Sequence, residues 1–230
     1  MSTWNRGGGC ADDICAIVTR KMEIMDWQLD AEEARVLGAL LEKEITTPDY
    51  YPLSTNALVN ACNQKSNREP VVNYDDGMVE DALDRLRAKG LAMRVSGDSR
   101  VAKHEQRFTE KFNLGRREAA LLCVLMLRGP QTPGELRGRT ERLFNFDDLE
   151  AVESTLHRLA EMEYTKKLPR RTGFKEQRWA QLLCGDVEEV GEAVAAAVER
   201  GPSDRDRIAR LETEMAELKE QFERFRRNFE

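Results

Sequence analysis

The sequence has little of the chemistry that most enzymes use. It contains only two histidines, His104 and His157, and neither stands beside a candidate nucleophile. The phosphate-binding motif G-x-x-x-x-G-K-[ST], the dinucleotide fingerprint G-x-G-x-x-G, the nucleophile elbow G-x-S-x-G and the zinc motif H-E-x-x-H are absent. The pairs Asp75-Asp76 and Asp147-Asp148 stand just before predicted helices, where capping accounts for them. We therefore expect a non-enzymatic protein with no catalytic residue, no cofactor and no metal site.

Long hydrophobic runs and a disulfide framework are also missing. No apolar stretch approaches the roughly 18 residues that a membrane span needs. Residues 1–26 lack a signal-peptide layout, because their short apolar part follows two aspartates. The five cysteines are odd in number and scattered, which favours reduced thiols. Cys10 and Cys15 have a spacing that a metal or redox pair can use, but without a nearby histidine we interpret it as incidental. These features predict a cytoplasmic protein that makes no membrane contact.

The composition is that of a folded, helix-rich protein. Hydrophobic residues make up 40% of the chain, charged residues make up 34%, and the formal net charge is −6. A chain of 230 residues can bury one large hydrophobic core or two small ones, and two domains are expected at this length. The acidic balance argues against a general nucleic-acid coat, but it allows a local basic patch.

One amphipathic pattern occurs twice. The stretch MVEDALDRLRAKG at 78–90 returns 73 residues later within LEAVESTLHRLAEME at 149–163, and both copies carry V-E-x-x-L-x-R-L. The helical pattern at 29–40 is matched at 114–125 with an offset of 85, and Glu105–Phe108 is matched by Glu176–Trp179 with an offset of 71. The offsets shrink because loops shorten while the elements persist, as in diverged duplicated domains.

Each copy has the order helix, helix, helix, hairpin. Asp30 with Glu33 and Thr132 with Glu135 are predicted capping boxes, and Ser54 is a predicted N-cap. Three helices followed by a hairpin in about 75 residues is the order of a winged helix-turn-helix. The alternative, a plain three-helix bundle, has no use for a hairpin after its third helix. The predicted fold class is mainly α with small β-hairpins (α+β): tandem winged helix-turn-helix domains followed by a C-terminal coiled-coil helix.

The first copy also carries a family signature. The stretch TTPDYYPLSTNALVNACNQKSNREPVVNYD closely resembles that of the YceH-like family, bacterial proteins of unknown function with two winged-helix units. The resemblance covers residues 29–183, and its most specific part is NACNQKSNREP at 60–70. It implies the fold and the kinship, and it brings no catalytic or ligand-binding residues with it.

The predicted domains are a mobile N-terminal tail at 1–26, winged-helix domains at 27–112 and 113–184, a linker at 185–206 and a coiled-coil helix at 207–230. Met22 or Met25 within the tail is a candidate translation start. Seven apolar residues of the last helix are spaced 3, 4, 3, 4, 3, 4: Ile208, Leu211, Met215, Leu218, Phe222, Phe225 and Phe229. This heptad seam predicts a homodimer through a short coiled coil. The alternative is a lone amphipathic helix that folds back on its own domain.

The repeated helix has the wrong charge for reading DNA. Val79, Leu83 and Leu86 are expected in the core, which leaves mainly acidic residues facing outward in the first copy. Residues 147–163 of the second copy contain six acidic residues and one arginine, a balance of −5. Because DNA binding depends largely on neutralising phosphates, such a helix should be repelled.

The second hairpin has the opposite charge. Six cations stand against Glu176 within 13 residues, a balance of +5: Lys166, Lys167, Arg170, Arg171, Lys175 and Arg178. We expect them to contact a DNA backbone or minor groove; the alternative is that they pair with the acidic helix of the adjacent copy or with a partner. Lys65 and Arg68, in the loop before the first repeated helix, form a second, weaker basic site.

Two functional hypotheses follow from these charges. In the first, the chain is a DNA-associated regulatory or architectural protein that contacts phosphate through the basic second wing. In the second, it is a protein-interaction scaffold whose acidic helix, with Glu150 and Glu153, docks a basic protein partner. The winged-helix prediction favours the first by analogy with other proteins of that fold.

Overall fold

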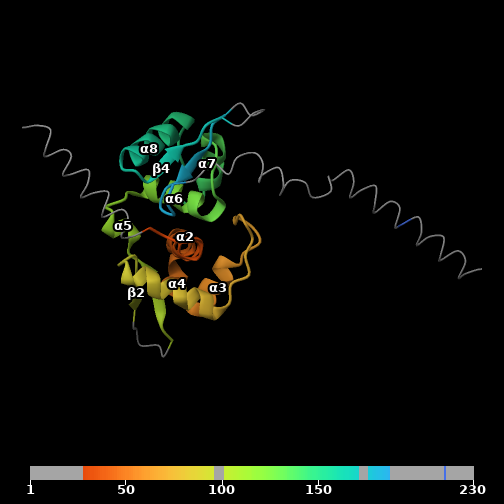
Figure 1. Ribbon diagram of the computed structural model, residues 1–230, viewed down its shortest axis with the longest axis vertical. Coiled ribbons are helices and arrows are strands. Elements are labelled where there is room, and N and C mark those ends of the chain that lie inside the picture. The colour runs from red at the N-terminus through yellow and green to blue at the C-terminus, as the bar shows by residue number, and fades with distance from the viewer. Residues whose placement is uncertain (1–27, 96–100, 171–175, 187–214, 216–230) are drawn as a thin grey trace, which may run out of the picture. The chain divides into compact units, whose positions relative to one another are not determined.

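The computed structural model describes residues 28–95, 101–170, 176–186 and 215 (Figure 1). The described residues from 28 to 186 belong to one compact unit, and Met215 belongs to a second unit. In the second unit only Met215 is described, as a helical residue with an exposed side chain. The first unit contains both kinds of secondary structure: helices predominate, and small antiparallel sheets accompany them.

The first unit consists of two halves with the same order of main elements. The first half contains α2 (Ala31–Thr46), the 3-10 helix η1 (Pro48–Tyr50), β1 (Leu53–Ser54), α3 (Thr55–Cys62), α4 (Asp76–Ala88), β2 (Ala92–Val95), β3 (Lys103–Gln106) and α5 (Phe108–Lys111). The second half contains α6 (Arg116–Arg128), α7 (Pro133–Thr140), α8 (Leu149–Glu161), β4 (Thr165–Lys167) and β5 (Trp179–Gln181). The predicted order of helix, helix, helix, hairpin is therefore confirmed in both halves.

The helices begin where capping residues satisfy their first amide groups. Asp30 and Glu33 form a capping box at α2, and Thr132 and Glu135 form one at α7. The side chain of Ser54 caps α3. In the repeated helices, the side chains of Asp75 and Asp148 accept hydrogen bonds from the third residue beyond them, Met78 and Ala151. These predicted caps are confirmed, which accounts for both aspartate pairs as helix starts.

Each hairpin gains a short third segment that the sequence did not predict. In the first half the sheet has the order β1-β3-β2, with Leu53 opposite His104 and Ala92 opposite Gln106. In the second half β4 pairs with β5, and Gln131 forms an isolated bridge with Trp179. The added segment precedes the second helix of each half. It is too short to show a strand periodicity in the sequence.

The two halves share one hydrophobic core, which is centred on α2 and α6. These helices are buried on almost every side, from Glu33 to Glu42 and from Glu118 to Leu127. They approach closely at Gly38, where a β-carbon would lie 3.0 Å from Cγ of Leu127. The first hairpin (β2–β3) and the second hairpin (β4–β5) lie on opposite sides of this helix pair (Figure 1).

Candidate functional site

The described cations of the second hairpin lie mostly at its surface. Lys166, Lys167 and Arg170 are exposed, whereas Arg178 is half-buried. Nζ of Lys166 lies 2.9 Å from Oδ1 of Asp186, and Nζ of Lys167 lies 5.7 Å from the centre of the Trp179 ring. The predicted cations Arg171 and Lys175 lie outside the described residues.

The outward face of α8 is acidic, as predicted. Glu150, Glu153 and Glu161 are exposed, while Val152, Leu156 and Leu159 are buried in the core. The first copy, α4, follows the same division: Val79, Leu83 and Leu86 are fully buried, and Glu80, Asp81 and Asp84 are exposed. The apolar stripe of the repeated helix is therefore structural. Neither copy presents a row of exposed cations suited to the major groove.

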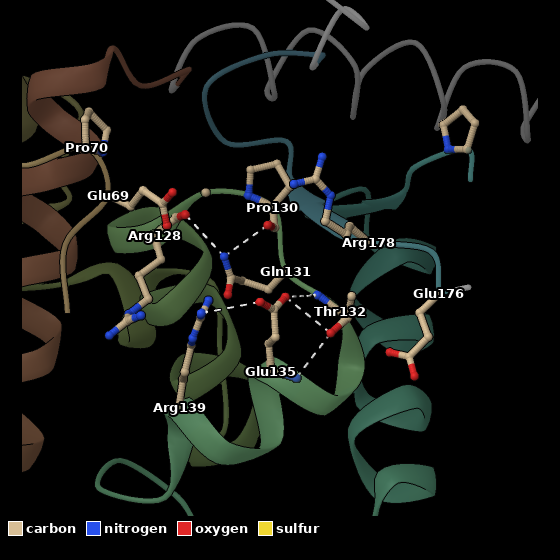
Figure 2. A pocket seen from close by; sticks show the side chains of 12 residues that line it. Glu69, Pro70, Arg128, Pro130, Gln131, Thr132, Glu135, Arg139, Glu176 and Arg178 are labelled. Atoms are coloured by element: carbon tan, nitrogen blue, oxygen red, sulfur yellow. Dashed lines mark hydrogen bonds and ion pairs between the residues drawn. The ribbon is translucent and has the colours of Figure 1, made fainter. Parts of the chain in front are cut away.

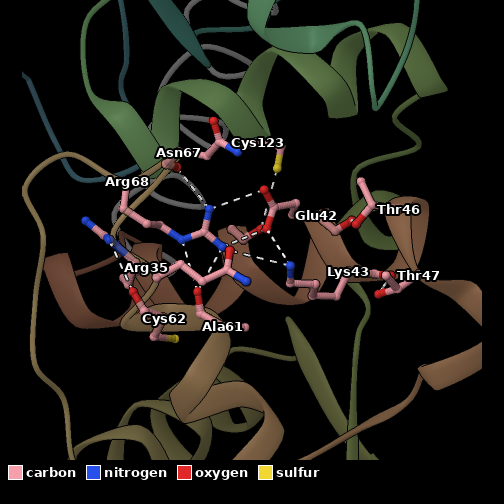
Figure 3. A network of polar contacts seen from close by, with 12 residues as sticks. Arg35, Glu42, Lys43, Thr46, Thr47, Ala61, Cys62, Asn67, Arg68 and Cys123 are labelled. Atoms are coloured by element: carbon pink, nitrogen blue, oxygen red, sulfur yellow. Dashed lines mark hydrogen bonds and ion pairs between the residues drawn. The ribbon is translucent and has the colours of Figure 1, made fainter.

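The predicted basic site at Lys65 and Arg68 requires a correction. Lys65 is exposed, but the Arg68 side chain is fully buried (Figure 3). Its guanidinium donates to both carboxylate oxygens of Glu42, at 3.2 and 2.6 Å, and to the carbonyl oxygen of Ala61 at 3.1 and 2.9 Å. Arg68 therefore stabilises the fold and is not available to bind phosphate.

Burial and ion pairing act in opposite directions on Glu42. Burial alone would raise the pKa of this carboxyl group, since it disfavours the charged form. The hydrogen bonds and charge of Arg68, together with the charge of Lys43, outweigh burial and lower the pKa of Glu42. The Glu42 carboxyl group therefore stays ionised inside the protein, where the hydrogen bonds from Arg68 compensate its desolvation.

The family-like stretch 60–70 joins the two halves. Arg35, on α2, donates to the carbonyl oxygen of Pro70 at 2.6 Å, and Glu69 N donates to the carbonyl oxygen of Leu127 at 2.9 Å. Arg128, on α6, donates to the side chain of Asn67, whose φ of 60° is in the left-handed region. The resemblance in this stretch thus falls on residues that hold a loop against both central helices.

A pocket of about 810 Å³ lies where this loop meets the second half (Figure 2). Its walls come from the loop, from the α6–α7 connection with α7, and from the hairpin residues between β4 and β5. The lining residues are Glu69, Pro70, Arg128, Gly129, Pro130, Gln131, Thr132, Glu135, Arg139, Pro169, Glu176 and Arg178. The sequence did not predict this pocket, because its walls are distant in the chain and carry no motif.

A buried glutamine lies at the centre of this pocket's lining residues (Figure 2). Gln131 is 4% exposed, and its Nε2 donates to the carbonyl oxygens of Arg128 and Pro130. Its Oε1 has no hydrogen-bond partner, and neither has Nη1 of Arg139. Nη2 of Arg139 lies 3.4 Å from a carboxylate oxygen of Glu135. The pocket therefore combines an unpaired acceptor with an unpaired donor.

The described residues bear on only some of the remaining predictions. His157 is exposed, and its ring meets the Trp179 ring edge-on, with centroids 5.0 Å apart. Apart from Met215, the heptad residues lie outside the described part of the chain. Within that part, no helix has the length and apolar character needed to cross a membrane, and no three or more His, Cys, Asp or Glu side chains gather as a metal site would require.

Comparisons with known proteins agree on one family. The family model described as "Protein of unknown function, DUF480" matches residues 29–174. A UPF0502 protein of Solibacter usitatus is 77% identical over 206 residues, which are 90% of this chain and 100% of the relative. A UPF0502 protein of Citrifermentans bemidjiense is 52% identical over 84% of this chain and 90% of the relative. The UPF0502 protein YceH of Salmonella paratyphi C is 46% identical over 86% of this chain and 96% of the relative.

The family model covers more than half of the chain, and these relatives align along most of their own length. The predicted resemblance to YceH-like proteins is therefore confirmed. The chain belongs to the UPF0502 (DUF480) family.

Proposed function

We propose that the chain is a non-enzymatic DNA-associated protein with two winged-helix units, which contacts phosphate through its second hairpin. The shared element order of the two halves supports the winged-helix assignment. The bridge of Gln131 to Trp179 and the pairing of Leu53 with His104 add to it, because a short strand before the second helix is found in both. In winged-helix proteins the hairpin is one of the elements that meet DNA.

The exposed cations of β4 and the residues after it carry this proposal. Lys166, Lys167 and Arg170 lie at the surface within five residues. The partner of Lys166 is Asp186, and both side chains of this pair are about half exposed or more, at 45% and 67%. An exposed ion pair contributes roughly 0–1 kcal/mol, so a DNA phosphate can replace Asp186 at little cost.

The exposed acids of α8 indicate how DNA would be contacted. Because this helix presents Glu150, Glu153 and Glu161, it would lose more by electrostatic repulsion than it gained from base contacts. Contact through the hairpin alone fixes position on the backbone but reads little sequence. The first hairpin lies on the other side of the α2–α6 pair (Figure 1), so the proposed contact involves the second hairpin alone. We therefore propose weak, sequence-tolerant binding.

Fluorescence anisotropy with a labelled DNA duplex at several salt concentrations tests this proposal. The wild-type chain should bind at about 50 mM salt and release DNA as salt rises. The triple variant Lys166→Ala, Lys167→Ala, Arg170→Ala should bind more weakly, with a salt slope smaller by roughly 0.9 for each phosphate contact removed. The matched control removes two cations of the first hairpin and the exposed first residue of α6: Arg94→Ala, Lys103→Ala and Arg116→Ala.

This control variant should bind as the wild type does. Absence of wild-type binding at low salt would reject the proposal, and so would equal losses in the two triple variants. The same measurement with unrelated duplex sequences should give affinities within about tenfold of one another, because phosphate contacts carry no sequence information.

A protein-binding scaffold is the second candidate function, and one feature of α8 favours it. Leu149 is 46% exposed at the start of the helix, beside the exposed Glu150 and Glu153. An apolar side chain with two acids suits a basic amphipathic partner. Affinity capture from cell extract should recover a basic protein that is lost with Glu150→Lys, Glu153→Lys. It should be retained with Glu161→Lys, Glu163→Lys near the other end of the helix.

We also propose that the chain forms a homodimer through its C-terminal heptad seam. The seam is apolar over seven successive a and d positions from Ile208 to Phe229, and so narrow a stripe requires a second helix to cover it. In analytical ultracentrifugation, the full chain should sediment as a dimer, and Leu211→Lys, Leu218→Lys should convert it to a monomer. A monomeric wild type at micromolar concentration would reject this arrangement.

A further inference from the structure

We propose that the pocket around Gln131 is a binding site for a short peptide or similar small zwitterion. The site is distinct from the proposed DNA contact, because Gln131 and Arg139 are not among the hairpin cations, although Arg178 belongs to both. Its volume of about 810 Å³ is in the range of small-molecule sites, roughly 300–1,000 Å³. The ligand follows from three properties of the lining: the unpaired atoms, the balance of charge and the prolines.

The unpaired atoms define the two polar groups that the ligand must carry. Oε1 of Gln131 is buried and accepts no hydrogen bond. A ligand that binds beside it should therefore supply an N–H or O–H donor. Nη1 of Arg139 is buried and donates no hydrogen bond, so the ligand should also supply a hydrogen-bond acceptor. Both residues belong to one pocket wall (Figure 2), which places the donor and the acceptor on the same small molecule.

The acceptor is best met by a carboxylate. Arg128 lies in the same lining as Arg139, and burial together with the charge of Arg139 lowers the pKa of Arg128. The Arg128 guanidinium already donates to the side chain of Asn67, so the group that an anionic oxygen would satisfy is Nη1 of Arg139. A carboxylate supplies such an oxygen with a single negative charge.

The remaining charges favour a zwitterion over a polyphosphate. The lining contains three arginines, and it also contains three glutamates: Glu69, Glu135 and Glu176. A nucleotide polyphosphate would bring several negative charges toward these carboxylates, which is unfavourable in a partly enclosed site. An ammonium group or N–H donor beside a carboxylate matches both sets of residues, and the free ends of a short peptide provide them.

The prolines provide apolar contact for the body of the ligand. Pro70, Pro130 and Pro169 come from three different segments that line the pocket. Their rings have no N–H to satisfy and little conformational freedom to lose, so small apolar side chains can pack against them at low entropic cost. A dipeptide such as alanyl-alanine fits this combination of groups.

Nuclear magnetic resonance titration of the full chain with alanyl-alanine tests the site directly. Saturable shifts should be seen at the Gln131 side-chain amide and at the Arg139 Nε–H, with a Kd of about millimolar order for so small a ligand. Alanyl-alanine amide, which lacks the carboxylate, should bind about tenfold more weakly or not at all. N-acetyl-alanyl-alanine, which lacks the ammonium group, should bind several-fold more weakly. Adenosine triphosphate should not produce these shifts.

Variants assign the binding to this pocket. Arg139→Leu and Gln131→Met should each weaken alanyl-alanine binding by about tenfold or more. Arg137→Leu is the matched control: Arg137 is on the same helix but is exposed and donates to the carbonyl oxygen of Asp147. If Gln131→Met does not fold, as its amide spectrum would show, Arg139→Lys replaces it, since lysine keeps the charge without the forked donors.

Three results would overturn the proposal. One is the absence of saturable shifts with alanyl-alanine up to concentrations well above its expected Kd. Another is binding that survives Arg139→Leu unchanged. The third is adenosine triphosphate or the amidated dipeptide binding as tightly as alanyl-alanine. Because no DNA is present in this experiment, its failure leaves the DNA proposal unaffected, and the reverse also holds.

Discussion

Arg158 of α8 and Glu118 of α6 form an ion pair, with Nη1 of the arginine 3.0 Å from Oε1 of the glutamate. The corresponding residues of the first half, Arg85 and Glu33, also approach each other, with Nε and Oε1 3.9 Å apart. In both halves, therefore, an arginine of the repeated helix reaches the third residue of the first helix. This explains why R and E recur at matching positions of the two copies.

The two glutamates should differ in their contribution to stability. Glu33 is fully buried and binds Nζ of Lys89 at 2.5 Å and the amide of Asp30 at 2.7 Å, whereas the partner of Glu118 is 66% exposed. We expect Glu33→Gln to lower the free energy of unfolding by about 1–3 kcal/mol and Glu118→Gln by less than about 1 kcal/mol. Urea denaturation measures both. Equal losses would contradict this interpretation.

Removing Arg68 should be strongly destabilising. Arg68→Leu leaves the buried Glu42 carboxylate with only Lys43, 3.4 Å away, as a charged partner, which costs up to about 3–5 kcal/mol. The double variant Arg68→Leu, Glu42→Leu should lose less than Arg68→Leu alone, because no unpaired charge remains. Lys65→Leu, an exposed cation of the same loop, should change stability by no more than about 0.5 kcal/mol. Thermal unfolding of the four proteins tests this order.

The close approach of α2 and α6 should make Gly38 sensitive to any larger side chain. A β-carbon there would lie 3.0 Å from Cδ2 of Leu127 and 3.3 Å from Cβ of Met126. Gly38→Leu should therefore destabilise the protein by about 1–3 kcal/mol, and Gly38→Ala should not give the usual helix gain. Gly138 of α7 is the control, because its β-carbon would meet nothing within 4 Å. Gly138→Ala should stabilise by about 0.5–1 kcal/mol.

His104 should make stability depend on pH. Burial and the charge of Arg87 lower the pKa of His104, which is 4% exposed on β3. The unfolded chain then binds a proton at a pH where the folded chain does not. The free energy of unfolding therefore keeps its full value above the ordinary histidine pKa of about 6.5 and decreases as the pH falls below it.

The measurement is urea denaturation between about pH 7.5 and pH 5. The wild type should lose stability on acidification, and His104→Gln should lose less over the same range. His157→Gln serves as the control, since His157 is exposed. If His104→Gln and the wild type show the same pH dependence, His104 is not the group responsible.

The local elements of the fold could be predicted because their signals are local. Asp30, Thr132, Asp75 and Asp148 cap helices in the structure as their spacing indicated, since a capping side chain bonds an amide only two or three residues away. The buried stripe of the repeated helix was equally clear, because positions three and four apart share one face. Because the same order of elements is predicted twice, the prediction for one half supported the prediction for the other.

Features formed between distant segments were not predictable in this way. Arg68 was expected at the surface, and only the approach of α2 showed that Glu42 accepts its hydrogen bonds in the interior. The helix α2 is buried from Glu33 to Glu42, charged residues included, because α6 and other helices pack against it. The pocket around Gln131 needed three segments to converge, and nothing in the residues near Gln131 marks its Oε1 as buried.

The sequence alone thus specified the family, the order of the elements, their caps and the acidic and basic faces that suggest a partner. The tertiary structure decided which charges remain available: it places Lys166 and Lys167 at the surface and buries Arg68. The reason is physical. Helix starts and amphipathic faces depend on residues within one or two turns, whereas the burial of a charge depends on which distant segment arrives to compensate its desolvation.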